Sequence, residues 1–164
     1  MTIADNQDKK FDIITISTTL KSLPDLEPLA KTLPLLLKPA GCVVSVDLHP
    51  AFSKPAGHRV IEIYEDPRTG KQQIDTYIKV KQYLYVEPSQ SEAVRGQAMP
   101  LTAYHRPVSP LFKHFFKNGL VVDEMMEPAF ETEGGDPAHP HSYHNFPQIP
   151  MPLAVRLKHA AVNE

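Results

Sequence analysis

Two polar residues follow closely on an apolar run and could carry acid–base chemistry. Asp47 and His49 stand at the end of residues 43–48, a run rich in valine. The ordinary pKa of an imidazole, about 6.5, suits a base that takes a proton from a phenol, an acid or an enol. We therefore consider His49 a candidate catalytic residue. Asp47 could pair with it or contact a substrate. The alternative for His49 is a loop histidine bonded to backbone, and the alternative for Asp47 is a cap or turn residue.

A second polar group occupies consecutive positions, Tyr104, His105 and Arg106. His105 is a second candidate acid or base. Tyr104 and Arg106 are candidate substrate contacts, because a guanidinium can hold a carboxylate through two parallel hydrogen bonds. The alternative is that the three residues serve helix entry and surface packing.

Three hydroxyl residues, Ser17, Thr18 and Thr19, end the apolar run that contains Ile13 and Ile16. In open α/β sheets, ligands bind beyond the carboxyl ends of the strands. The three residues are therefore candidate cofactor contacts, with simple strand termination as the alternative.

A histidine-rich segment contains His139, His141 and His144. Such tracts can bind zinc or copper. The neighbouring prolines and the loop setting give these histidines no fixed ligand geometry, so we predict a solvated loop and no metal site.

Composition narrows the class of protein. The formal net charge is −2 and there is no basic block, which argues against nucleic acid and anionic membranes as partners. Cys42 is the only cysteine, so no internal disulfide can form, and we expect a buried thiol and a cytoplasmic setting. The first ten residues lack the apolar segment of a signal peptide, and no apolar run approaches the roughly 20 residues that span a bilayer.

The hydrophobic pattern predicts one α/β domain over residues 11–160, after a disordered tail over residues 1–10. Strands are expected at 11–17 and 43–48, both buried on two faces, and at 120–126 and 153–157. A helix should start at Asp25, face the sheet with its leucines, and bend or end at Pro34, and residues 38–41 should turn the chain. A second helix is expected at 110–118, with Phe112, Phe115 and Phe116 in the core and Gly119 as its cap. Residues 59–65 and 73–86 predict a β-hairpin within an insertion over 51–105 that serves as a lid.

Four segments, in order, resemble class I S-adenosylmethionine-dependent methyltransferases, and in particular a branch that acts on small molecules. They are FDIITIS with LKSLPDLEP and LLLKPAG, then DLHPAF, then YHRPVS, and finally FPQIP with LAVRL. The resemblance covers residues 11–158 and corresponds to the C-terminal half of that family. It implies a partial Rossmann-like sheet with strands corresponding to 4-5-7-6, one or two flanking helices and an added hairpin lid.

Two features of the family are missing from the sequence. None of the seven glycines forms the GxG motif of the family's cofactor loop, and the acidic residue that holds the cofactor ribose is also absent. The resemblance therefore implies that S-adenosylmethionine binds only with a partner chain, and that otherwise there is no cofactor. The strand 11–17, central in the family, would be an apolar edge strand here, so we expect a second copy or a complementing chain to pair with it.

Three functions follow as alternatives. The first is a methyltransferase-like protein that acts on a small organic molecule in specialised metabolism, with a partner chain. The second is a cofactor-independent enzyme on the same fold, such as a cyclase, isomerase or pericyclase, that uses histidine acid–base chemistry. The third is a scaffold without catalysis or a truncated gene product.

Overall fold

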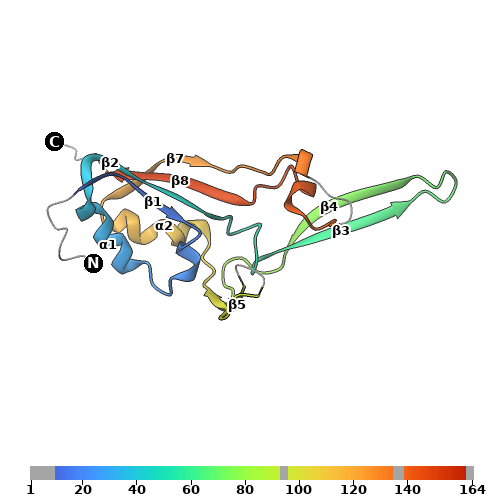
Figure 1. The fold of residues 1–164 in the computed structure, drawn as a ribbon, viewed down its shortest axis with the longest axis horizontal. Helices are drawn as coiled ribbons and strands as arrows, with labels where there is room; N and C mark the ends of the chain where they lie inside the picture. Colours follow the sequence, from blue (N-terminus) through green and yellow to red (C-terminus); the bar gives the residue numbers. More distant parts are fainter. Residues whose placement is uncertain (1–9, 93–95, 135–138, 162–164) are drawn as a thin grey trace.

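A mixed sheet of four strands forms the body of the protein. The structure is a computed structural model that describes residues 10–92, 96–134 and 139–161, so the predicted tail lies almost wholly outside the described residues. The strands lie in the order β1 (Phe11–Ser17), β2 (Leu37–Leu48), β8 (Pro152–His159) and β7 (Leu120–Met126) (Figure 1). β1 runs parallel to β2, and β8 runs antiparallel to both of its neighbours. This is the predicted strand order 4-5-7-6.

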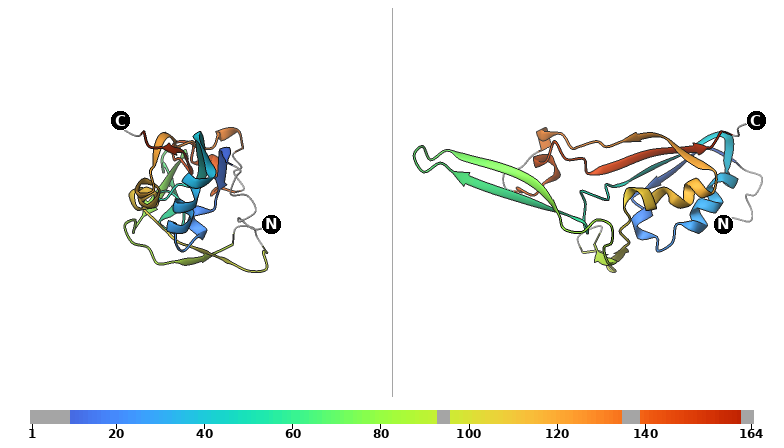
Figure 2. Two further views of the ribbon diagram at one scale, coloured as in Figure 1. Left: turned by 90° about the vertical axis from the view of Figure 1, so that its left-hand side faces the viewer. Right: turned by 180° about the vertical axis from the view of Figure 1, so that it is seen from behind.

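Two helices lie on one side of the sheet, α1 (Glu27–Leu36) and α2 (Val108–Lys117) (Figures 1 and 2). The N-cap of α1 is Leu26 rather than the predicted Asp25, although Asp25 Oδ1 accepts a hydrogen bond of 2.9 Å from the backbone N–H of Glu27, the first residue of the helix. Pro34 lies inside α1, which ends two residues later. Gly119 ends α2 with a φ of 76°, a conformation that costs little only in glycine. Three short 3₁₀ helices complete the helical elements: η2 (Leu20–Ser22), η3 (Thr132–Gly134) and η4 (Tyr143–Asn145).

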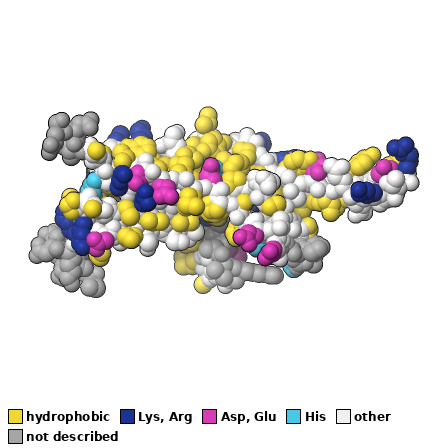
Figure 3. All heavy atoms as spheres, turned by 90° about the horizontal axis from the view of Figure 1, so that it is seen from above, with side chains coloured by type: hydrophobic (Ala, Val, Ile, Leu, Met, Phe, Trp, Pro, Cys, Tyr) yellow, Lys and Arg dark blue, Asp and Glu magenta, His cyan; other side chains and the backbone are white. Residues whose placement is uncertain are grey.

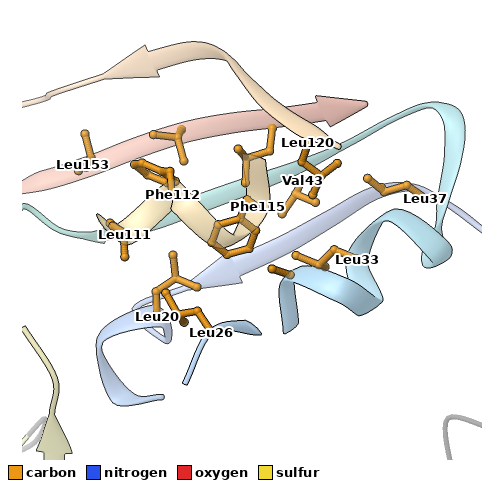
Figure 4. Packing of buried hydrophobic residues seen from close by; sticks show 13 residues of the cluster. Leu20, Leu26, Leu33, Leu37, Val43, Leu111, Phe112, Phe115, Leu120 and Leu153 are labelled. Atoms are coloured by element: carbon orange, nitrogen blue, oxygen red, sulfur yellow. The ribbon is translucent and has the colours of Figure 1, made fainter. Parts of the chain in front are cut away.

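The hydrophobic core lies between the sheet and the two helices (Figure 4). Val43 and Leu157 from the strands meet Leu33 of α1 and Phe115 of α2, and each is at most 3% exposed. Burial of a side chain of this size stabilises the fold by about 1.5–3 kcal/mol. Phe116 is 50% exposed, so the prediction that it belongs to the core is wrong.

In the part of the chain that the structure describes, no helix lies on the opposite face of the sheet (Figure 1), and this corrects the prediction of strands buried on both faces. Strand alternation and register place Ile13, Val46 and Met126 on that face, where they are 60%, 36% and 58% exposed. Cys42, on the same face, is half-buried rather than buried. Figure 3 shows hydrophobic side chains spread over this side of the body.

Ion pairs stabilise the far edge of the sheet, where β7 pairs with β8. Both oxygens of Asp123 accept hydrogen bonds of 2.9 Å from the guanidinium of Arg156, and Lys158 Nζ lies 3.1 Å from the same carboxylate. The Arg156 hydrogen bond above all, together with Lys158, lowers the pKa of Asp123 to about 2. This edge thus carries a cluster of charges, whereas β1 at the opposite edge carries an ion pair of 2.8 Å between Asp12 and Lys38, beside the exposed apolar residues Phe11 and Ile13.

A β-hairpin stands outside the main sheet, as the sequence predicts. Its strands are β3 (Gly57–Glu65) and β4 (Gln72–Val80), and it projects from the body along the long axis of the molecule (Figure 1). β4 ends six residues earlier than predicted. A small strand pair that the sequence did not predict, β5 (Ser89–Ser91) and β6 (Leu101–Ala103), follows it. In the described parts of the chain, no helix is long and apolar enough to span a membrane.

Candidate active site

A small cavity lies where β2 ends and the segment before α2 crosses the sheet edge. Its walls include Asp47, Tyr104, His105 and Arg106, together with Lys21. The structure thus brings Asp47 together with the second polar group that the sequence analysis singled out, residues 104–106. The cavity volume of about 30 Å³ has room for one or two water molecules.

Asp47 places a buried carboxylate in this cavity, since the residue is only 7% exposed. Its Oδ1 accepts a hydrogen bond of 2.8 Å from the N–H of Leu48, and its Oδ2 accepts a longer one of 3.4 Å from the N–H of Lys21. A carboxylate has about four lone-pair sites, so acceptor capacity remains for a ligand. In the described chain these contacts, rather than His49, are the hydrogen-bond partners of Asp47.

His105 is held so that one ring nitrogen keeps a lone pair. Its Nε2 lies 2.6 Å from the carbonyl oxygen of Tyr83, and the two rings meet edge to face. A carbonyl oxygen only accepts hydrogen bonds, so Nε2 must carry the hydrogen. In the neutral ring Nδ1 is then the unprotonated nitrogen. A half-buried imidazole with a bare Nδ1 beside a cavity can act as a general base.

Arg106 binds the protein's own backbone. Nη1 donates to the carbonyl of Leu20 at 3.2 Å, and Nη2 donates to those of Leu23 and Pro24 at 2.7 and 2.8 Å. Burial lowers the pKa of Arg106 from its ordinary value, but a guanidinium remains charged at any physiological pH. These contacts occupy both terminal nitrogens, the two that a bidentate carboxylate contact would use. The guanidinium also lies 5.9 Å from the centre of the Tyr104 ring.

His49 is buried beside the cavity, at 5% exposure, and both of its ring nitrogens have partners. Nδ1 accepts a hydrogen bond of 3.1 Å from the N–H of Ala51, and Nε2 lies 2.8 Å from a carboxylate oxygen of Glu127. The neutral ring therefore donates through Nε2 to Glu127. The ring also stacks on Phe52 at 4.5 Å. This geometry holds in place the turn after β2, which contributes Ser53 to the cavity wall.

The three hydroxyl residues after β1 lie at the same edge of the sheet. Thr18 has a φ of 48°, which is a strained conformation for a β-branched residue, and its N–H donates to the carbonyl of Val46 at 2.7 Å. The hydroxyl of Thr19 donates to the carbonyl of Ser17 at 2.7 Å. These bonds fix the chain between β1 and η2, the short helix that carries Lys21 to the cavity.

The histidine-rich segment packs against the base of the hairpin. Arg59 lies over the ring of Tyr143, with 4.1 Å between the guanidinium carbon and the ring centre, and also donates to the carbonyl of His141. Tyr143 stacks on Phe130, and His144 Nδ1 lies 2.6 Å from the carbonyl of Glu131. Within the described ranges, no group of three or more acidic, cysteine or histidine residues is arranged to hold a metal.

Sequence reasoning missed two residues of the site, Tyr83 and Glu127. Glu127 could have been found, because β7 and β2 run in the same direction and the residues after their carboxyl ends meet at one edge. Tyr83 carries no such signal. It lies in a polar stretch that we assigned to a strand, yet its carbonyl accepts from His105 and its hydroxyl accepts from the N–H of Val108 at the start of α2.

A wider groove adjoins the small cavity and shares Tyr104, His105 and Arg106 with it. The groove has a volume of about 360 Å³, and its outer wall consists of residues 84–88, which include Leu84 and Tyr85. These two side chains are 84% and 70% exposed, so water reaches the groove freely. Among the described residues, no residue of β3 or β4 lines the small cavity or the wider groove.

Comparison with known proteins identifies the fold. Neither protein-family models nor curated protein sequences match the chain. Among solved structures, it is similar to an S-adenosylmethionine-dependent methyltransferase from Listeria monocytogenes, with a TM-score of 0.63 and 19% identity over 93% of this chain and 63% of that one. It is also similar to an S-adenosylmethionine-dependent methyltransferase from Mesorhizobium loti, with a TM-score of 0.58 and 21% identity over 90% of this chain and 61% of that one. The CcbJ methyltransferase from Streptomyces caelestis matches with a TM-score of 0.51 and 13% identity over 94% of this chain and 59% of that one.

This chain has a partial methyltransferase fold. It spans less than two thirds of the length of the methyltransferases that it matches, 63%, 61% and 59%. At the end of β1, the hydroxyl of Thr19 and the N–H of Thr18 are bonded to the chain's own carbonyls. The cavity of Asp47 and His105 is the candidate place for acid–base chemistry in this partial fold.

Proposed function

We propose that this protein is the substrate-binding part of an S-adenosylmethionine-dependent methyltransferase for a small organic molecule, in specialised metabolism. The observation that carries the proposal is the cavity of Asp47 and His105 at the carboxyl end of β2 in a partial methyltransferase fold. Ligands bind at this end of the strands in open α/β sheets. The cofactor, when bound, would supply the methyl group for a direct displacement.

In this proposal the chain's own residues bind the acceptor and remove its proton. His105 Nδ1 takes the proton from the nucleophilic atom, since Nε2 is fixed on the carbonyl of Tyr83. Asp47 Oδ2, which has only one long hydrogen bond, accepts a further one from the substrate. Tyr104 forms part of the wall against which the substrate lies. Placement of a reactant in this way can lower a barrier by several kcal/mol.

A partner chain completes the cofactor site at the β1 edge. One side of β1 pairs with β2, and in the described structure the other side pairs with no strand. Phe11 and Ile13 on this strand are 43% and 60% exposed. Natural proteins protect apolar edge strands because exposed edges aggregate. We propose a complementing chain that adds a strand there and brings the missing cofactor contacts beside Ser17, Thr18 and Thr19.

Calorimetric titration with S-adenosylmethionine tests this proposal. The isolated chain is expected to give no saturable binding, because Thr18 and Thr19 alone contribute too few contacts. The matching experiment uses the same protein purified together with whatever chain pairs with β1, and saturable binding is expected there. Tight binding by the isolated monomer would contradict the proposal.

A second candidate is a cofactor-independent enzyme on the same fold. The observation in its favour is that Asp47 and His105 both come from this chain, so acid–base chemistry needs no partner. Product formed without S-adenosylmethionine, and lost in a His105→Gln variant, would favour this candidate. If the isolated chain neither binds nor converts any small molecule, a scaffold without catalysis is the remaining alternative.

A further inference from the structure

The hairpin has two chemically different faces. Register and alternation place Ile61, Ile63, Ile74 and Ile78 on one face. The other face carries the Glu62–Lys79 ion pair of 3.1 Å and Gln73, together with two tyrosines, Tyr64 and Tyr77, that are 64% and 41% exposed. Ile63 and Ile74 lie directly opposite each other and are 64% and 61% exposed. A two-stranded hairpin is only marginally stable in water without cover for such a face.

The hairpin does not cover the groove of its own chain. It extends away from the body (Figure 1), and in the described structure no residue of 58–79 lines the groove beside His105. The outer wall of that groove includes Leu84 and Tyr85, which are largely exposed, and Glu87, which accepts a hydrogen bond of 2.8 Å from the Tyr85 hydroxyl. One chain thus carries two surfaces with exposed apolar side chains that do not contact each other in the described structure.

From these two surfaces we infer that the protein forms a two-fold dimer in which each hairpin lies, isoleucine face down, over the groove of the other copy. Contact areas favour a second copy over an unrelated partner. A strand of nine residues is about 30 Å long and two strands are about 10 Å wide, so one hairpin face covers about 300 Å². A single contact would bury about 600 Å² in total, which is less than the roughly 1,000 Å² of a specific interface. Two reciprocal contacts bury up to about 1,200 Å², an upper limit that passes this threshold, because Arg59 at the base of the same face already contacts Tyr143 and His141 of its own chain.

The dimer would complete the active site. The partner's isoleucines would exclude water from the groove next to His105, as an enzyme lid does. This role as a lid in trans rests on the proposed function, whereas the dimer itself does not. The contact is also compatible with a chain bound at β1, because β1 and the hairpin lie toward opposite ends of the molecule (Figures 1 and 2).

Mass measurement by light scattering tests the dimer. At about 100 µM, a concentration that populates a dimer even when its Kd is in the micromolar range, the protein is expected to have twice the chain mass of 18.4 kDa. The double variant Ile63→Lys/Ile74→Lys should have the mass of one chain. The matched control Tyr64→Lys/Gln73→Lys adds the same charges to the opposite face of the hairpin and should remain a dimer. A monomeric wild type, or a dimeric isoleucine variant, would overturn the inference.

Engineered disulfides test where the hairpin lies. In a Cys42→Ser background, Ile74→Cys with Leu84→Cys is expected to form a covalent dimer on oxidation. Gln73→Cys with Leu84→Cys, which moves the thiol to the other face of the hairpin, should not. Equal crosslinking in the two pairs would contradict the proposed docking even if the protein is dimeric. Neither measurement depends on cofactor binding, so failure of the dimer and failure of the proposed function can be told apart.

Discussion

Replacing His105 with glutamine is expected to slow the reaction by about 10²–10⁴-fold, which is the usual contribution of a general base. Glutamine can still donate to the carbonyl of Tyr83, as His105 Nε2 does at 2.6 Å, but it offers no basic nitrogen to the cavity. The thermal stability of the variant should therefore stay near that of the wild type. The measurement is transfer of labelled methyl from S-adenosylmethionine to a panel of phenols, acids and enols, with the β1 partner present.

His49→Gln is the matched comparison. Because His49 is buried and both of its nitrogens have partners, we expect this change to reduce stability more than His105→Gln does, and to reduce the rate less. The same pair tests the sequence-based prediction that His49 is a catalytic residue. If His49→Gln abolishes the reaction in a folded protein while His105→Gln keeps the full rate, then His49 is the base and our assignment of His105 is wrong.

Replacing Arg106 with alanine is expected to destabilise the fold by about 3 kcal/mol. The change leaves the carbonyls of Leu20, Leu23 and Pro24 without their charged donor, and each unsatisfied group costs roughly 1–3 kcal/mol. Because water can reach part of this site, the lower end of that range applies. For a domain of this size, the melting temperature should fall by about 6–12 °C. Thermal unfolding followed by circular dichroism measures this directly.

The control for this prediction is Lys31→Ala. Lys31 forms an exposed ion pair of 2.6 Å with Glu27 on α1, and solvent screening leaves such a pair with little effect on stability. Its melting temperature should change by no more than 1–2 °C. An Arg106→Ala variant as stable as Lys31→Ala, but with weaker substrate binding, would show that the guanidinium serves the ligand rather than the backbone.

The sequence predicted most of the sheet, because its strands are short apolar runs separated by turn residues. The sequence-based prediction failed where the burial of a strand residue depends on whether a second layer of the fold covers that face of the sheet. The run of Val43, Val44 and Val46 reads as buried on both sides, yet only Val43 faces the helices and Val46 is 36% exposed. A pattern of β-branched residues cannot reveal that the layer covering its second face is absent from the described structure.

The candidate site was predicted in part for a similar reason. Asp47 and His105 stand next to clear strand and helix boundaries, so their meeting at one sheet edge follows from topology. The partners of the two histidines do not follow from the pattern. Glu127 and Tyr83 reach His49 and His105 across 78 and 22 residues, and it is these contacts that decide which ring nitrogen keeps its lone pair. Likewise, Arg106 reads as a ligand for an anion until its backbone carbonyl partners are known.

The central claim is that β1 is an uncovered apolar edge beside the cofactor wall, completed only by another chain. Hydrogen exchange over β1 (Phe11–Ser17) and β2 (Leu37–Leu48) in the isolated chain tests it most directly. We predict that the amides of β1 that do not donate to β2 exchange rapidly, while the central amides of β2 stay protected. Addition of the partner chain should then slow exchange in β1. If all amides of β1 in the isolated chain are already as protected as those of β2, the edge is covered and the account is wrong.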